Sequence, residues 1–320
     1  MSSPPAVTAF APGGVGNVGP GLDILGLAVS GLGDEVRAEW SDRPGITILD
    51  PGHPDLPSEA HRHTAGLAAR AVNTAVGGEA IRGGRGIALT VRKGLPLCGG
   101  QGGSAASAVA GAVAVNALLG APLDRHALLD ACLVAEETVA GRHLDNIAPS
   151  LLGGIVLIRS MHPLDIVRLP VPEELVVVLV RPDQEMRTSE ARAVLPAEVT
   201  RATALHQAAQ VGALVAALAA GDYALLGRAI DDRIAEPARA RLLPGFVEVK
   251  AAALGAGALG SSISGSGPTT FALARGELDG KRIGAVMVAA YAALGIRSEA
   301  RMGRVDREGA RLVEPKGGPA

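Results

Sequence analysis

Aromatic residues are the first shortage in this sequence. They make up only 2% of its 320 residues, so a core must be built from Ala, Val, Leu and Ile. Few rings are therefore available to stack on nucleic-acid bases. The net charge of −2 provides no broad basic field for a phosphate backbone either. We therefore expect no nucleic-acid partner.

Cysteine and long apolar runs are also scarce. The two cysteines, Cys98 and Cys132, do not form a Cys-x-x-Cys motif, which favours a reduced, cytoplasmic setting. The first residues lack a basic segment followed by an apolar stretch, so we expect no signal peptide. No run of about 18 purely apolar residues occurs, so we expect no membrane span.

Glycine, by contrast, is abundant, with 43 residues that cluster instead of repeating with a period. The length allows two domains or one large one. The irregular alternation of predicted strands and helices indicates an α+β fold. Hydrophobic periodicity predicts strands at 36–40, 87–91, 155–158, 175–180, 269–274 and 296–302, helices at 63–76, 104–119, 125–140, 198–220, 223–234 and 282–294, a loop at 41–62 and a polar connection at 159–172.

The strongest glycine cluster runs from Gly94 to Ser107, between a predicted strand and a predicted helix. Glycines let backbone N–H groups approach a phosphate closely, and the helix N-terminus adds positive potential and free donors. Ser104 stands at the helix start, where its hydroxyl could cap the helix or bind Mg²⁺. The structural alternative is a flexible turn capped by Ser104. No Gly-Lys-Ser/Thr follows the glycines, so this is not a Walker A loop.

Two further glycine-rich segments run from Pro12 to Gly26 and from Gly255 to Pro268. The first contains a formal match to the dinucleotide fingerprint, but Pro20 falls where the Rossmann helix needs a backbone donor. A dinucleotide-dependent oxidoreductase is therefore disfavoured. Each segment alone could be a turn, but three in one chain of this length favour a phosphate-binding site.

The order and spacing of the three segments resemble the three motifs of the GHMP small-molecule kinases over essentially the whole chain. Within that superfamily, finer motifs resemble the homoserine kinase family. They are Asn17 to Gly26 with Asp34 to Val36, His143 to Gly154, Thr188 to Pro196, and Glu236 to Phe246.

The resemblance implies an N-terminal domain similar to the second domain of ribosomal protein S5 and a ferredoxin-like C-terminal domain. We place these at residues 1–165 and 166–313, with a tail at 314–320. It also implies phosphoryl transfer from ATP to the side-chain hydroxyl of L-homoserine, giving O-phospho-L-homoserine in threonine biosynthesis. A homodimer is expected from the family resemblance alone.

The resemblance implies a role for each matching residue. Asn17 and Asn146 would orient the hydroxyl as catalytic residues, and Ser104 and Glu136 would hold Mg²⁺. The substrate's ammonium would bind Asp23 and its carboxylate would bind Arg192 and Arg239, with His143 and Asp145 lining the same pocket. The ATP phosphates would be wrapped by Lys93, Pro96, Gly99, Gly100, Gly102, Gly103, Ser104, Ala105 and Ser107.

The sequence also departs from the family pattern. Gly103 replaces the first serine of a usual pair, and one residue fewer separates Glu136 from His143, so Glu137 could be the metal ligand instead. Asn146 stands where several relatives have an Asp base, which favours proton loss directly to the γ-phosphate. Two alternatives stay open at this point: a GHMP kinase for a different alcohol, and an inactive GHMP-fold protein that senses a ligand.

Overall fold

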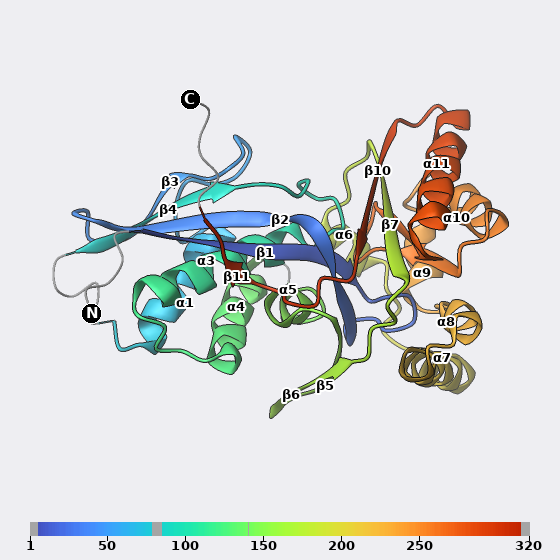
Figure 1. The fold of residues 1–320 in the computed structure, drawn as a ribbon, viewed down its shortest axis with the longest axis horizontal. Coiled ribbons are helices and arrows are strands. Elements are labelled where there is room, and N and C mark those ends of the chain that lie inside the picture. Colours follow the sequence, from blue (N-terminus) through green and yellow to red (C-terminus); the bar gives the residue numbers. More distant parts are fainter. Residues whose placement is uncertain (1–5, 79–84, 140, 315–320) are drawn as a thin grey trace.

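The computed structural model describes residues 6–78, 85–139 and 141–314. Within these residues the chain forms a seven-stranded sheet and a four-stranded sheet, each covered by helices (Figure 1). The mixture of sheet and helix confirms the predicted α+β class.

The larger sheet is built mainly from the first half of the chain. Its strand order is β11-β1-β2-β4-β3, with β5 pairing with β2 and β6 pairing with β5. All these pairs are antiparallel except β3 with β4. The strands are β1 (Ala6–Gly16), β2 (Leu25–Ser41), β3 (Gly45–Asp50), β4 (Gly86–Arg92), β5 (Ile155–Met161), β6 (Leu164–Leu169) and β11 (Arg311–Leu312).

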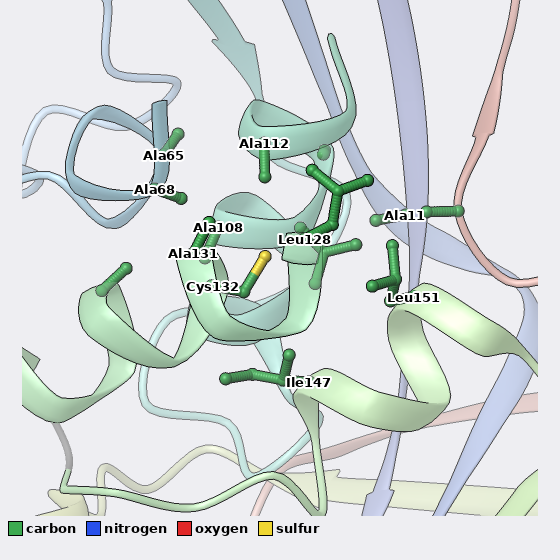
Figure 2. Close-up of a cluster of buried hydrophobic side chains, with 14 of the residues drawn as sticks. Ala11, Ala65, Ala68, Ala108, Ala112, Leu128, Ala131, Cys132, Ile147 and Leu151 are labelled. Carbon is green, nitrogen blue, oxygen red and sulfur yellow. The ribbon is translucent and has the colours of Figure 1, made fainter. Parts of the chain in front are cut away.

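One face of this sheet is covered by four helices (Figure 1): α1 (Thr64–Ala75), α3 (Gly103–Leu118), α4 (Arg125–Val139) and α5 (Ile147–Leu152). Their shared core consists mostly of alanine and leucine (Figure 2). Small side chains bring α1 and α3 so close that a Cβ at Gly111 would lie 2.8 Å from the Ala65 carbonyl oxygen. A core with few aromatic side chains is therefore filled by helices that pack closely together.

The smaller sheet has the order β10-β7-β9-β8. Alternate residues of its strand β7 face opposite sides, as strand geometry requires. Val176 and Val178 pack under α11, whereas Val177 and Leu179 join a second core that includes Leu27 of the larger sheet. The elements are β7 (Leu175–Pro182), β8 (Gly260–Ile263), β9 (Thr270–Arg275), β10 (Ser298–Arg304), α6 (Thr188–Ala193), α7 (Arg201–Ala220), α8 (Tyr223–Ala229), α9 (Ala235–Ala240), α10 (Phe246–Gly255) and α11 (Glu277–Ala293).

Most predicted elements are confirmed, but several boundaries are wrong. The first glycine-rich segment is not all loop, because its residues up to Gly16 extend β1 with an irregular register after Pro12. The predicted loop at 41–62 contains β3, and the predicted connection at 159–172 contains the end of β5 and all of β6. The predicted helix at 223–234 ends at Ala229, and residue 140 of the predicted helix at 125–140 lies outside the described residues.

The two sheets do not divide the chain into one N-terminal part and one C-terminal part. The predicted division at 165/166 falls within β6, and β11 returns from the C-terminal part to pair with β1.

The helix α7 is long and apolar enough, by length and composition alone, to cross a membrane. Three of its side chains, Leu214, Ala217 and Leu218, nevertheless pack into the second core.

Candidate functional site

A pocket of about 670 Å³ opens where the three glycine-rich segments meet. All of the predicted site residues line it, although they come from positions between 17 and 239 of the chain. The structure therefore brings together the residues to which the family resemblance assigns a first role, and leaves the alternative Glu137 outside. Their individual roles stay predictions.

Hydrogen bonds join the three segments directly. The backbone N–H of Gly265 donates to the Gly16 carbonyl oxygen at 3.1 Å, and the Asn17 Nδ2 donates to the Gly265 carbonyl oxygen at 3.0 Å. The hydroxyls of Ser264 and Thr269 donate to the carbonyl oxygens of Gly100 and Gly99 at 2.6 and 2.5 Å. These bonds hold the peptide planes of the Gly94–Ser107 segment in one orientation.

The turn after β1 has an unusual backbone. Asn17, Val18 and Asp23 all have positive φ angles, of 68°, 45° and 62°. Asn tolerates this region, whereas a β-branched Val is rarely found there and costs free energy. The turn is held by the Asp23 N–H, which donates to Asn17 Oδ1 at 3.0 Å, and by the Gly21 N–H, which donates to the Asn17 carbonyl oxygen at 2.9 Å. The strained residue, Val18, therefore directly follows Asn17 of the pocket wall.

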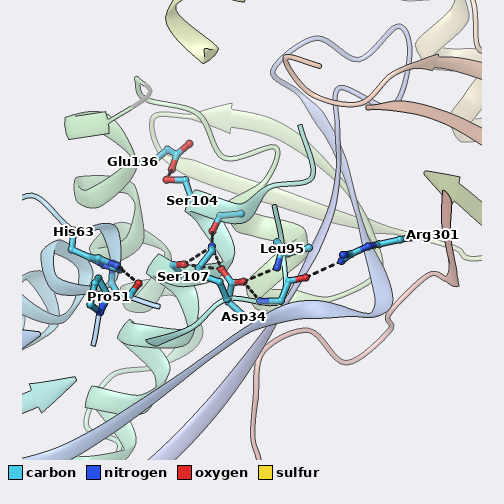
Figure 3. Close-up of polar contacts among 12 residues, drawn as sticks. Asp34, Pro51, His63, Leu95, Ser104, Ser107, Glu136 and Arg301 are labelled. Atoms are coloured by element: carbon cyan, nitrogen blue, oxygen red, sulfur yellow. Dashed lines mark hydrogen bonds and ion pairs between the residues drawn. The ribbon is translucent and has the colours of Figure 1, made fainter. Parts of the chain in front are cut away.

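The helix α3 begins at the pocket. Its N-cap, Gly102, is left-handed with φ 71° and has no side chain to cap the first turn. The Ser104 hydroxyl makes no cap either; it donates to Glu136 Oε2 at 3.4 Å (Figure 3). The first N–H groups of α3 are thus left for a ligand, as helix N-termini that bind anions require.

Glu136 and Glu137 of α4 point in different directions. Glu136 is only 8% exposed and lines the pocket. Glu137 lies outside and pairs with Arg142, at 3.3 Å between Oε2 and Nη1. Burial, and then the charge of Asp145, raise the pKa of Glu136 to about 7. Glu136 therefore has the better geometry for the predicted metal role.

The residues predicted to bind an amino acid form one charged cluster. The Arg192 guanidinium donates both Nη1 and Nη2 to the Asp23 carboxylate, at 3.3 and 2.7 Å, and His143 Nδ1 lies 3.5 Å from Asp23 Oδ1. Burial lowers the pKa of His143. Arg239 is buried and donates to the carbonyl oxygens of Ala191 and Gly265 at 3.1 and 2.8 Å. The cluster thus offers one carboxylate and two guanidinium groups within one pocket.

Asp145 is buried within this cluster. Burial, and then the charge of Asp23, raise its pKa to about 7. Its Oδ2 accepts from Asn146 Nδ2 at 3.3 Å. A Cβ at Gly16 would lie 2.5 Å from that oxygen, so only glycine leaves room for the carboxyl group there. The side chain of Asn146 lies between Gly16 and Gly102, since a Cβ at these glycines would lie 2.7 Å from its Nδ2 and 3.1 Å from its Oδ1.

Several residues that line the pocket were not predicted from the sequence. The segment read as a polar loop supplies Leu56, Pro57 and Arg62 to the pocket wall. His63 caps α1, because its Nδ1 accepts from the Ala65 N–H at 3.1 Å while Nε2 lies 3.2 Å from the Pro51 carbonyl oxygen (Figure 3). The Pro- and Asp-rich composition of that loop gave no signal for these positions.

Asp34 and Asp232 were also given no role, although each organises part of the site. Asp34 contacts Lys93 and Ser107, which lie at the two ends of the Gly94–Ser107 segment. Asp232 accepts from the N–H groups of Ile234, Ala235 and Glu236 and so holds the start of α9, which carries Arg239. Position 232 falls within the helix predicted at 223–234, so periodicity offered no sign that Asp232 lies beyond the end of that helix.

Comparisons with known proteins agree with the motifs. The family model of the GHMP kinases N terminal domain matches residues 63–154, and that of the GHMP kinases C terminal domain matches 214–293. A homoserine kinase of Arabidopsis thaliana is 45% identical over 96% of this chain and 85% of its own length. One from Chlorobium phaeovibrioides is 42% identical over 96% and 99%. The crystal structure of homoserine kinase from Cytophaga hutchinsonii superposes with a TM-score of 0.92 at 40% identity, covering 98% of this chain and 99% of that one.

The raised pKa of Glu136 predicts a pH-dependent stability difference. The folded state holds its proton up to about pH 7, whereas the unfolded state loses it near pH 4. Glu136 therefore contributes a loss of stability as pH rises from about 4 to 7, and Glu136→Gln lacks this contribution. We expect the free energy of unfolding of Glu136→Gln, relative to wild type, to rise by up to about 3 kcal/mol over this range and to be constant above it.

Urea unfolding at several pH values, without nucleotide or metal, measures this difference. Glu137→Gln is the matched control, since that side chain is 55% exposed and its replacement should change stability by a small, constant amount. Parallel pH profiles for wild type and Glu136→Gln would contradict the assigned burial effect.

Proposed function

This chain belongs to the homoserine kinase family of GHMP kinases, and we propose that it transfers the γ-phosphoryl group of ATP to the side-chain hydroxyl of L-homoserine. The observation that carries the proposal is the cluster of Asp23, Arg192 and Arg239 beside the Gly94–Ser107 loop. An amino acid presents an ammonium and a carboxylate, and this cluster offers a partner for each. The product is O-phospho-L-homoserine, an intermediate of threonine biosynthesis.

The substrate's two charges determine its orientation. Arg239 keeps two of its donors on backbone carbonyl groups, which fixes the guanidinium plane, and its remaining donors can bind a carboxylate. Arg192 would join it once the substrate ammonium replaces Arg192 at Asp23. With His143 and Asp145 beside Asp23, the zwitterion would be held at both ends. Positioning of this kind supplies much of the catalysis in phosphoryl transfer.

Asn17 and Asn146 would orient the reacting hydroxyl. Their side-chain amides cannot accept a proton at neutral pH. Asn17 is itself fixed by bonds to Asp23 and Gly265, so its free N–H direction is set by the fold. In this mechanism the hydroxyl proton passes directly to an oxygen of the transferred phosphoryl group.

The nucleotide would lie along the Gly94–Ser107 segment. The backbone N–H groups at the start of α3 would bind its phosphates. Leu56, Pro57 and the nearby Pro96 and Leu97 line the same pocket and offer apolar surface for the nucleobase. Each proline also lacks a backbone donor, so the base would be recognised by other groups of these loops.

The metal that accompanies the nucleotide would be Mg²⁺, held by Ser104 and Glu136. Among the described residues no group of three His, Cys, Asp or Glu side chains could hold a metal by itself. Two oxygen donors 3.4 Å apart fit Mg²⁺, because this ion usually takes few protein ligands and completes its shell with phosphate and water oxygens. Bound there, it would neutralise developing phosphate charge.

We also propose a cytoplasmic setting and a homodimer. Both cysteines have free thiols, Cys98 exposed and Cys132 buried, as a reduced compartment favours. The homodimer rests on family resemblance; light scattering of the purified protein tests it, and a mass of one chain would refute it.

A coupled ADP-release assay with homoserine, mevalonate, shikimate and galactose tests the activity. We expect turnover with homoserine and little with the other three. Turnover of another alcohol without homoserine turnover would replace the substrate. Binding of ATP without turnover of any alcohol would instead support an inactive ligand sensor.

Arg239→Ala tests the carboxylate clamp. Loss of charge-assisted hydrogen bonds should raise the KM for homoserine by about 100-fold and the KM for ATP by less than about threefold. Arg241→Ala is the matched control, because this neighbour is exposed and its guanidinium donates to the Ala238 carbonyl oxygen. Arg239→Lys keeps the charge if the alanine variant folds poorly. Equal rises in both KM values would refute the assignment.

Asn146→Asp tests the absence of a protein base. The new carboxyl would lie beside Asp145, and two adjacent carboxylates raise each other's pKa. A protonated carboxyl cannot accept the substrate proton, so we expect kcat to fall at pH 7 to 8. The kcat at saturating homoserine and ATP, measured across this range, gives the result. A clear increase would mean that a base at this position assists the reaction.

A further inference from the structure

Asp34 of β2 is a completely buried carboxylate beneath the Gly94–Ser107 loop (Figure 3). Its Oδ1 accepts from the backbone N–H groups of Gly94 and Leu95, at 3.0 and 3.2 Å. Its Oδ2 accepts from the Ser107 hydroxyl at 2.7 Å and from the Lys93 ammonium. One carboxylate therefore contacts both ends of the loop.

Lys93 has committed all of its donors inside the protein. An ammonium group has three N–H bonds. Those of Lys93 go to Asp34 Oδ2, to the Gly103 carbonyl oxygen at 3.0 Å and to Ser107 Oγ at 2.9 Å. The Lys93 side chain is only 7% exposed. A phosphate could recruit this ammonium only by replacing one of these partners.

These contacts fix the loop where it starts and where it ends. Gly94 and Leu95 follow β4, whereas Gly103 and Ser107 belong to the first turns of α3. Across the loop entry, Arg301 of β10 donates to the Gly94 carbonyl oxygen at 2.9 Å (Figure 3). The separation between β4 and the N-terminus of α3, and with it the shape of the loop, therefore depends on the Asp34 carboxylate and its partners.

We infer that Asp34, Lys93 and Ser107 form a positioning unit that shapes the phosphate loop, and that Lys93 acts on the nucleotide through this unit and not as a direct phosphate ligand. The inference rests on the proposed use of ATP. It differs from the role that the family resemblance implied for Lys93 and Ser107.

Buried ion pairs respond to substitution in a way that separates the two roles. Removing one partner leaves an uncompensated buried charge, whereas removing both charges together is often nearly neutral. Asn at position 34 keeps an oxygen that can accept from Gly94 and Leu95, and Met at position 93 keeps the unbranched apolar stem. The double variant Asp34→Asn/Lys93→Met should therefore retain the loop shape without the ammonium.

Titration calorimetry with ATP and excess Mg²⁺, without homoserine, measures the nucleotide affinity of each variant, and steady-state assays add kcat and the KM for ATP. We expect Lys93→Met and Asp34→Asn each to weaken ATP binding by about tenfold or more. The double variant should return to within about threefold of wild type. Lys250→Met is the matched control: it breaks the part-buried Lys250–Glu236 pair, outside the pocket, and should leave ATP affinity unchanged.

Other outcomes would overturn the inference. A double variant as weak as Lys93→Met would make Lys93 a direct phosphate ligand, as would an Asp34→Asn variant that binds ATP more tightly because its lysine is released. Wild-type affinity in all variants would mean that the pair does not shape the loop. If Lys93→Met does not fold, the comparison of ATP affinity between Asp34→Asn and the double variant still distinguishes the two roles of Lys93. Failure of the wild type to bind ATP would instead refute the proposed function.

Discussion

The site depends on backbone segments that approach too closely for side chains to fit between them. A Cβ at Gly14 would lie 1.9 Å from the Leu27 carbonyl oxygen, and one at Gly100 would lie 2.6 Å from that of Gly267. Such distances leave space only for a hydrogen atom, so the glycines allow three distant parts of the chain to share one set of hydrogen bonds. The Gly265 carbonyl oxygen illustrates the result, because it accepts from both Asn17 and Arg239. Asn17 near the end of β1 and Arg239 of α9 are thereby held at fixed positions beside the pocket.

Electrostatics follow from this close packing. Two carboxyl groups of the pocket, Glu136 and Asp145, are buried in its wall and so lose solvation. Glu136 and Asp145 both hold their protons up to about pH 7 for this reason, and Arg192 only partly offsets the effect. A cation bound between Glu136 and Ser104 would place a positive charge beside the Glu136 carboxyl group. An ammonium bound at Asp23 would do the same for Asp23. The site thus carries acidic and basic groups that suit ligands of the opposite charge.

Much of the fold could be predicted where hydrophobic periodicity was strong. The helices α1, α3 and α4 and the strand β7 were placed within a few residues, and the family predicted from the glycine-rich segments is confirmed by the family models and relatives. The strand β1 was missed because its last residues are mostly glycine and proline, which usually mark turns; here the neighbouring strand β2 supplies the hydrogen bonds. The short helices α6 and α9 were missed because six residues are too few for a periodic pattern.

The sequence by itself determined the residue types of the site: three glycine-rich segments, paired acidic and basic side chains, and motifs whose spacing identifies a kinase family. These features are local, so they can be read along the chain. Tertiary structure alone decided that Glu136 and not Glu137 faces the pocket, because neighbouring helix positions point about 100° apart and only packing selects the inward one. It also decided that the Lys93 ammonium is occupied by Asp34, 59 residues earlier in the chain. Contacts at such separation arise from the pairing of β2 with β4, which leaves no periodic signal in the sequence.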